Sequence, residues 1–432
     1  MYIRGSKWNM TRKKRRRVNP FTVIFLLLAI GAVVFFDRWI APTVPDLFMP
    51  TLTATRPPES YISDAQELEA AGKYTQAIDA YKQAIIVDPK NPSNFIALAR
   101  LEIYTTNYQE ALDDSANALL INPKNSVALA LQGWIYGFMG DYIKAEGALN
   151  NAIEQDPNNA VAYAYLTEVY LDMVNAGQGT LDTMDKAIAA SKSAQALAPE
   201  SLETHRARGL VLENTSNYEE AVAEFEAAIA INPNIADLHL ALGRNYKVLQ
   251  RYDEAINEFS RAISLNPKDS APYSLISGTY FTNGDDVKAL QYAQDALKVG
   301  PTDPYLYGNI GLIYWETKDY QSAVDALRIA TQGGVAQSGE EVKGLPLDYG
   351  RPGYYYYTLG LALANLGQCG EALPIAQSVA SNLKTDEIAQ YNAQEIINIC
   401  EQVAKYGGVP TVTSEATQSS DSGSSAGTTP GP

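Results

Sequence analysis

Small and apolar residues recur along the chain with a period of 34 residues. One series of alanines comprises Ala77, Ala111, Ala145, Ala187, Ala221, Ala255, Ala289 and Ala323. A second series follows seven residues later, at Ala84, Ala118, Ala152, Ala194, Ala228, Ala262, Ala296 and Ala330. An aromatic or apolar residue often lies between the two alanines, as Tyr81, Leu149 and Phe225 do. These spacings place the three positions on one face of a helix, so the pattern predicts one helix with a buried, small-residue face in each unit.

A second pattern precedes this helix in each unit, as in the stretches "YAYLTEVY" and "HLALGRNY". It places a small residue among large apolar ones, which lets two helices approach closely. A proline follows the second helix of seven units and ends it, because proline cannot donate a backbone hydrogen bond and clashes with the preceding turn. These prolines are Pro89, Pro123, Pro157, Pro199, Pro233, Pro267 and Pro301. The pattern therefore predicts a row of helical hairpins.

The unit resembles the tetratricopeptide repeat, a 34-residue helix–turn–helix motif. The best match is residues 236–269, which place His239, Leu242, Gly243, Tyr246, Ala255, Phe259, Ala262 and Pro267 at the family's positions. About nine units fit between residues 58 and 384. The resemblance implies an all-α fold, a right-handed α-solenoid of helix-turn-helix repeats.

The period is interrupted at two places, near residues 172–184 and 333–352, where insertions are expected. Residues 385–405 have a capping-type start and helical spacing of apolar residues. We expect them to form a helix that covers the last open face of the solenoid. Residues 406–432 are rich in Ser, Thr, Gly and Pro and are predicted to be disordered.

The N-terminal segment has the composition of a membrane anchor. Residues 1–17 include a basic cluster, and residues 18–36 carry no charge. As a helix, this run of 19 residues would reach ~28 Å, about the thickness of a hydrocarbon core. A single transmembrane signal anchor is favoured over a cleaved signal peptide, because apolar residues continue past the small residues of "AIGA". A nuclear-type basic cluster beside a buried helix is the third interpretation.

The same segment predicts an orientation. Basic residues beside a span stay on the cytoplasmic side, so residues 1–17 should be cytoplasmic. Residues 37–57 are rich in proline and predict a stiff stalk. We therefore expect a single-pass protein of the cytoplasmic membrane, in a bacterium, with an extracytoplasmic repeat body.

Charge excludes one class of partner. Residues 1–36 hold eight of the 33 basic residues and no acid, so the remainder carries 25 basic against 49 acidic residues. Nucleic-acid affinity comes mainly from neutralised phosphates, and so acidic a body predicts no nucleic-acid binding.

No pattern of catalytic or metal-binding residues is present. The two histidines, His205 and His239, are 34 residues apart and occupy the aromatic place of their units, which indicates packing. No phosphate-binding loop, nucleophile elbow or zinc spacing occurs. We expect no enzymatic activity, no cofactor and no metal.

Binding is better supported, because stacked hairpins form a concave groove lined by the first helix of each pair. With the geometry that the resemblance implies, the groove-facing side chains are Ile96, Arg100, Trp134, Phe138, Glu168, Arg206, Arg244, Lys247, Phe281, Tyr305, Trp315, Tyr354 and Tyr357. Aromatic residues and Arg dominate binding energy at protein interfaces. The alternative is that many of these aromatic side chains pack between adjacent units.

Some grooves of the family clamp a peptide's terminal carboxylate with Lys and Asn at set places, which this chain does not reproduce. Arg206, Arg244 and Lys247 fall in consecutive units and are candidates for holding an acidic group.

These observations predict a membrane-anchored scaffold or adaptor whose groove binds a peptide or a helix of a partner protein. The alternative is an accessory or regulatory subunit of a cell-envelope biosynthetic enzyme complex. The sequence does not determine the oligomeric state.

The only two cysteines are Cys369 and Cys400. Suppose that the second helix of the ninth unit and the terminal helix form an antiparallel hairpin that turns at residues 384–385. Residues whose numbers add to 769 then face each other, and 369 and 400 add to 769. An even cysteine count in an extracytoplasmic setting favours a disulfide. Two unpaired, buried thiols are the alternative.

Overall fold

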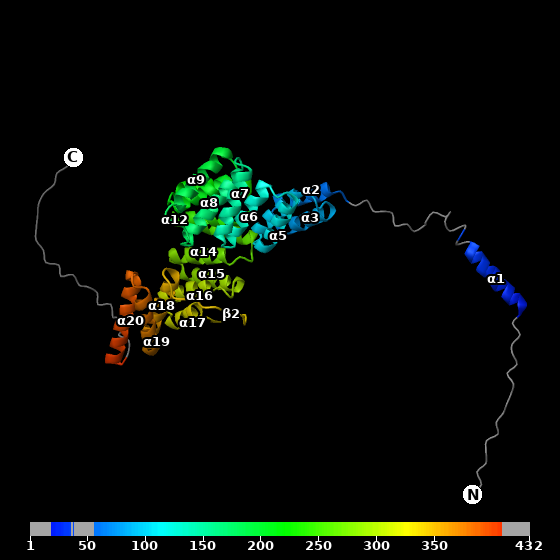
Figure 1. Ribbon diagram of the computed structural model, residues 1–432. Coiled ribbons are helices and arrows are strands. Elements are labelled where there is room, and N and C mark those ends of the chain that lie inside the picture. The colour runs from blue at the N-terminus through cyan, green and yellow to red at the C-terminus, as the bar shows by residue number, and fades with distance from the viewer. Residues whose placement is uncertain (1–18, 36–37, 39–55, 408–432) are drawn as a thin grey trace, which may run out of the picture. The chain divides into compact units, whose positions relative to one another are not determined.

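The computed structural model describes residues 19–35, 38 and 56–407. The chain divides into two compact parts, Met1–Pro57 and Pro58–Pro432. The basic residues 1–17, most of the predicted stalk and the tail from residue 408 lie outside the described residues (Figure 1).

The first part contains one described helix, α1 (Pro20–Phe35). Asn19 caps it, its Oδ1 accepting a hydrogen bond from the backbone N–H of Phe21 at 3.1 Å. All its side chains are exposed. α1 has 16 residues, and in the described ranges no helix combines the length and apolarity needed to cross a bilayer. The predicted span runs from residue 18 to residue 36, and both of these end residues lie outside the described ranges.

The described residues of the second part are helical apart from one short hairpin and the connecting turns, and helices α2–α19 form nine successive pairs (Figure 1). The first helices of the pairs are α2 (Pro58–Ala70), α4 (Pro92–Tyr104), α6 (Ser126–Phe138), α8 (Ala160–Asn175), α10 (Leu202–Asn214), α12 (Ala236–Val248), α14 (Ala271–Thr282), α16 (Pro304–Glu316) and α18 (Arg351–Asn365). The second helices are α3 (Tyr74–Val87), α5 (Tyr108–Ile121), α7 (Tyr142–Gln155), α9 (Thr183–Leu197), α11 (Tyr218–Ile231), α13 (Tyr252–Leu265), α15 (Asp286–Val299), α17 (Tyr320–Gln332) and α19 (Cys369–Asn382). The prediction of nine helical hairpins is confirmed, and we number these pairs as units 1–9.

Local sequence chemistry sets the limits of the helices. Many first helices begin after an Asn, Asp or Ser cap; Asn125, for example, accepts a hydrogen bond from the backbone N–H of Ala128 at 3.1 Å. Each unit then turns through one residue with positive φ between its two helices, at Gly72, Thr106, Gly140, Gly177, Ser216, Gln250, Gly284, Lys318 and Gly367. Second helices end just before the predicted prolines, as α3 does at Val87.

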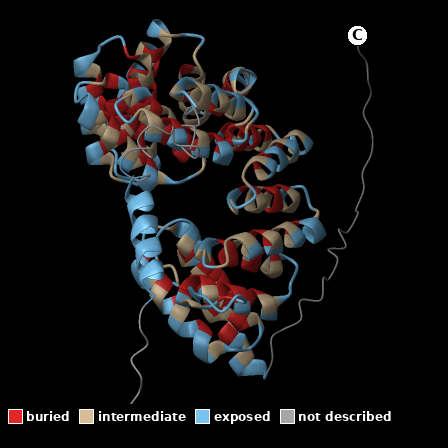
Figure 2. Cartoon of the chain, turned by 90° about the vertical axis from the view of Figure 1, so that its right-hand side faces the viewer, coloured by how far each residue is buried: buried red, intermediate tan, exposed pale blue. Residues whose placement is uncertain are grey.

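Small residues allow the two helices of a unit to pack closely, as the sequence predicted. The alanines of both series are almost completely buried. A Cβ added to Gly133 would lie 2.6 Å from Leu149, and one added to Gly209 would lie 2.8 Å from Phe225. The buried positions occupy the interior between helices and the exposed ones the outer faces (Figure 2).

The connections between helices are longer at two places. In unit 4, α8 extends to Asn175 and a loop leads to α9, which begins at Thr183. Between α17 and α18 the chain forms an antiparallel hairpin of β1 (Gly334–Val335) and β2 (Glu341–Val342), an element that the sequence analysis did not predict.

A terminal helix, α20 (Glu387–Tyr406), packs on α18 and α19. Its cap is Asp386, which accepts a hydrogen bond from the backbone N–H of Ala389 at 2.9 Å. Cys369 and Cys400 form a disulfide, with their Cα atoms 5.5 Å apart. The predicted cysteine pairing is confirmed.

Unit 1 also contacts a distant part of the chain, the turn between α11 and α12. Asn234 donates a hydrogen bond to the carbonyl of Ala70 at 3.2 Å, and Asn232 donates one to the hydroxyl of Tyr74 at 3.4 Å. Gly72 (φ 71°) lies so close that an added Cβ would be 2.8 Å from the Asn234 side chain. The first unit therefore contacts the turn that follows the fifth unit, so that the two ends of the segment formed by units 1–5 touch.

Candidate partner-binding surface

In units 3–5 the predicted groove residues pack against one another and form hydrogen bonds with one another. Trp134 and Arg206 are 3% and 7% exposed. The ring of Trp134 stacks on Tyr165 at 4.2 Å between centroids, and the Arg206 guanidinium lies 5.0 Å from the Trp134 ring. The indole N–H donates to Glu168 at 2.8 Å. The aromatic surface of this half is thus internal packing, which is the alternative considered for the predicted groove aromatics.

The charge of Arg206 is neutralised by two acids. Its Nε lies 3.1 Å from Glu168 and its Nη2 3.6 Å from Asp237. Burial raises the pKa of Glu168 to about 7, although Arg206 and the Trp134 N–H act to lower it. Burial likewise raises the pKa of the neighbouring Asp172 to about 6. Arg206 therefore has no free charge to offer an acidic ligand in this structure.

Two other predicted cations also have acidic partners, each in the preceding unit. Arg100 lies 2.9 Å from Glu69, and Arg244 forms two hydrogen bonds with Glu213, at 2.9 and 3.2 Å. Of the three basic residues proposed to hold an acidic group, only Lys247 remains without an ion pair among the described residues.

Lys247, on α12, extends across the neighbouring first helix. A Cβ on Gly278 of α14 would lie 3.2 Å from its Nζ, so the ammonium group rests on the bare backbone of that glycine. Burial lowers the pKa of Lys247, and the positive charge of Arg351 lowers it further. Arg351 of α18 is therefore near enough to Lys247 of α12 to act on it as a like charge.

A polar chain connects α14, α16 and α18. Asn309 donates to Ser274 at 3.2 Å and accepts from the hydroxyl of Tyr355 at 2.7 Å. Arg351 donates to the same Asn309 oxygen at 3.4 Å. We call Lys247, Asn309 and Arg351 the cationic site.

Asn309 and Arg351 were not among the predicted site residues. Arg351 follows the second insertion, where the repeat register gives no guidance. One signal was available: the place of Gly278 holds Arg100, Trp134, Glu168, Leu210, Arg244 and Leu312 in other units. A glycine there opens the surface of α14.

The remaining predicted residues differ in exposure. Tyr305 and Tyr354 are 41% and 37% exposed, whereas Tyr357 is buried. Phe281 is partly buried beside the apolar cluster of units 7 and 8. Trp315 is also partly buried, and its ring lies 5.2 Å from that of Tyr320. Phe138 is partly buried and stacks on Tyr108 at 5.1 Å.

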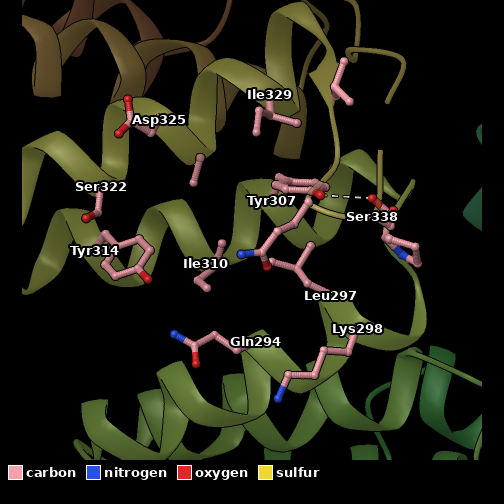
Figure 3. Close-up of a pocket in the computed structure, with 14 residues that line it drawn as sticks. Gln294, Leu297, Lys298, Tyr307, Ile310, Tyr314, Ser322, Asp325, Ile329 and Ser338 are labelled. Atoms are coloured by element: carbon pink, nitrogen blue, oxygen red, sulfur yellow. Dashed lines mark hydrogen bonds between the residues drawn. The ribbon is translucent and has the colours of Figure 1, made fainter. Parts of the chain in front are cut away.

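A separate hollow of about 920 Å³ lies beside the inserted hairpin (Figure 3). Helix α16 lines it with Tyr307, Ile310 and Tyr314, and α15 and α17 supply further residues. Val335, Gln337 and Ser338 of the insertion complete the lining. Tyr307 is fixed there, because its hydroxyl donates to the carbonyl of Pro301 at 3.0 Å.

The histidines have structural roles. His205 and His239 contact Glu224 and Glu258 through Nδ1 at 2.7 and 2.6 Å, and His239 also contacts the carbonyl of Pro233. In the part of the chain that the structure describes, no group of His, Cys, Asp and Glu is arranged to hold a metal ion.

Three sequence profiles described as tetratricopeptide repeat match the chain. One matches residues 64–126, 184–234 and 288–336, another residues 215–277, and a third residues 127–159. Together they cover more than half of the chain, which therefore belongs to the tetratricopeptide repeat proteins. These are non-enzymatic protein–protein interaction scaffolds.

Solved structures of similar proteins include a tetratricopeptide repeat protein from Parabacteroides merdae, 17% identical, covering 59% of this chain and 98% of that chain with a TM-score of 0.37. A thermophilic repeat protein from Thermus thermophilus is 22% identical, over 44% of this chain and 100% of that one, with a TM-score of 0.38. PilF of Pseudomonas aeruginosa is 19% identical, over 48% and 90%, with a TM-score of 0.39. No curated protein matches the sequence.

Proposed function

We propose that the chain is a membrane-anchored scaffold that binds an extended segment or a helix of a partner protein on the surface formed by α12, α14, α16 and α18. The observation that carries this proposal is the contrast between the two halves of the repeat array. The predicted groove side chains of units 3–5 contact one another, whereas Tyr305 and Tyr354 are exposed and Lys247 has no acidic partner among the described residues. Exposed aromatic side chains beside polar groups are typical of interface anchors.

The membrane part of the proposal concerns residues 18–36, with the repeats on the extracytoplasmic side. The described helix within that stretch, α1, contains no charged residue. The disulfide between Cys369 and Cys400 fits the proposed side, because disulfides persist in oxidising compartments.

Partner capture from cells that produce the full-length chain tests the binding surface. The double variant Tyr305→Ala/Tyr354→Ala should lose a partner that the wild type retains after washing. A matched control is Tyr391→Ala, a Tyr on α20 that is 70% exposed and outside the proposed surface. Equal recovery of every partner by the double variant and the wild type would refute the assignment of this surface.

Protease accessibility tests the orientation. In permeabilised cells with an intact cytoplasmic membrane, added protease should digest the repeats and leave residues 1–17 protected. Protection of the repeats, with digestion only after the membrane is disrupted, would place them in the cytoplasm.

A further inference from the structure

We infer that Lys247, Asn309 and Arg351 form a site for the side-chain carboxylate of an Asp or Glu in the partner's segment. This inference rests on the proposed function and specifies the chemistry of its ligand. It begins from the geometry around α14: the Lys247 ammonium group lies over Gly278, and Arg351 is joined through Asn309 to Ser274, one turn away on the same helix. Among the described residues neither cation forms an ion pair.

The position of Lys247 is set by its neighbours. Its ammonium group lies over Gly278, where the missing side chain leaves it room. Arg351 acts on it as a like charge and lowers its pKa, in addition to the effect of burial. An anion between the two would replace this repulsion with two attractive contacts, so the free protein carries an unfavourable term that a ligand removes.

Arg351 is held by Asn309. The Asn309 side chain is oriented by three contacts, with Ser274, Tyr355 and Arg351. Its Oδ1 accepts from both Tyr355 and Arg351, and the bond from Arg351 uses one of the five N–H donors of the guanidinium group. A guanidinium group matches the two oxygens of a carboxylate.

Nearby acids favour a ligand with a single negative charge. Asp303 and Glu316 lie close enough to raise the pKa values of Tyr355 and Tyr354, although burial is the larger cause for both tyrosines. The chain as a whole has a net charge of −16. Such surroundings oppose a dianion such as phosphate more strongly than a carboxylate.

Fluorescence anisotropy with the full-length protein tests the site, with a labelled octaglutamate peptide as the probe and labelled octaglutamine as its neutral counterpart. The wild type should bind octaglutamate alone. Lys247→Gln and Arg351→Gln should each weaken binding about tenfold, the effect expected from losing one charge-assisted contact. Arg328→Gln is the matched control, because Arg328 is paired with Glu371 on the second-helix side, and it should bind like the wild type.

Gly278→Ala distinguishes a built site from general attraction, since it changes no charge. The added methyl group would displace the Lys247 ammonium group and should weaken octaglutamate binding severalfold. Circular dichroism and thermal unfolding would verify that each variant is folded. No binding by the wild type, or equal affinity in Lys247→Gln, Arg351→Gln and the wild type, would overturn the inference.

Competition identifies the ligand class. At equal ionic strength, free glutamate should displace the peptide at least as well as inorganic phosphate does, and stronger displacement by phosphate would overturn the choice of a carboxylate. Failure of these tests would leave the proposed function standing if partner capture still depends on Tyr305 and Tyr354. If capture does not depend on them, the proposed function fails independently.

Discussion

Arg206 on α10 and Glu168 on α8 form an ion pair that is closed to solvent, with 3.1 Å between Nε and Oε1. The carboxylate also accepts a hydrogen bond from Trp134, whose ring lies beside the guanidinium group. These three side chains come from three consecutive first helices, so the contacts connect units 3, 4 and 5.

Arg206→Met should therefore destabilise the protein by about 3–5 kcal/mol, because it leaves a buried carboxylate without its counter-charge. Chemical denaturation followed by circular dichroism measures this change. Adding Glu168→Gln should recover part of the loss. Arg244→Ala serves as a comparison, since that pair is 40% exposed at the arginine and should contribute about 1 kcal/mol or less. Equal effects of Arg206→Met and Arg244→Ala would contradict the structural role assigned to Arg206.

The buried carboxyl of Glu102 should make stability depend on pH. It lies 3.5 Å from Lys82, and burial together with Asp114 raises its pKa from 4.5 to about 7. The native state thus retains a proton that the unfolded chain loses above its own pKa. The resulting stabilisation is fully present below about pH 4.5 and is lost as the pH rises through about 7.

Glu102→Gln keeps the shape of the side chain and removes the titration. Between pH 5 and pH 8 the free energy of unfolding of the wild type should fall by about 1–3 kcal/mol more than that of the variant. Urea denaturation at several pH values provides the measurement. Parallel pH profiles of the two proteins would show that Glu102 does not titrate in this range.

The disulfide should stabilise the C-terminal end of the array. It closes a loop with a sequence separation of 31 residues, so its removal in Cys369→Ser/Cys400→Ser should cost about 3 kcal/mol. Thermal unfolding with and without reductant tests this, and reductant should affect only the wild type. Alkylation of the denatured, unreduced protein gives a direct check: modification of both cysteines would mean that no bridge forms.

The closure of units 1–5 can be tested with two glycines of matched backbone conformation. Gly72 and Gly140 have φ values of 71° and 75°. A Cβ on Gly72 would meet Asn234 at 2.8 Å, whereas one on Gly140 would meet nothing within 4 Å. Both Ala variants incur the backbone strain of about 1 kcal/mol, but Gly72→Ala should cost roughly 1 kcal/mol more. It alone should speed hydrogen exchange in α2 and α3.

Local rules explain why the hairpins were predictable. Close packing of Gly133 against Leu149, and of Gly209 against Phe225, requires a small residue at one place and a large one at another within a single unit. Such a requirement leaves a periodic record in the sequence. The cysteine pair was predictable for a similar reason, because it spans only one turn between two helices.

Contacts between distant units leave no such record. The hydrogen bond from Asn234 to Ala70 joins residues 164 apart and depends on small rotations summed over several units. The pairing of Arg206 with Glu168 depends on how far α8 and α10 turn toward each other across the first insertion. Arg351 follows the second insertion, so its approach to Asn309 could not be placed by the 34-residue register.

Tandem repeats commonly change in number through duplication or deletion of whole units. In this chain, the contact between Ala70 and Asn234 restricts where the number of units can change without loss of a contact. Inserting or removing one unit between α3 and α11 would carry the turn at Asn234 one step along the solenoid, away from Ala70, and both hydrogen bonds of that contact would be lost. Units after α13 do not lie between the two sides of this contact. Among descendants of a common ancestor, gain or loss of repeats should therefore be tolerated in the C-terminal units and selected against in the first five.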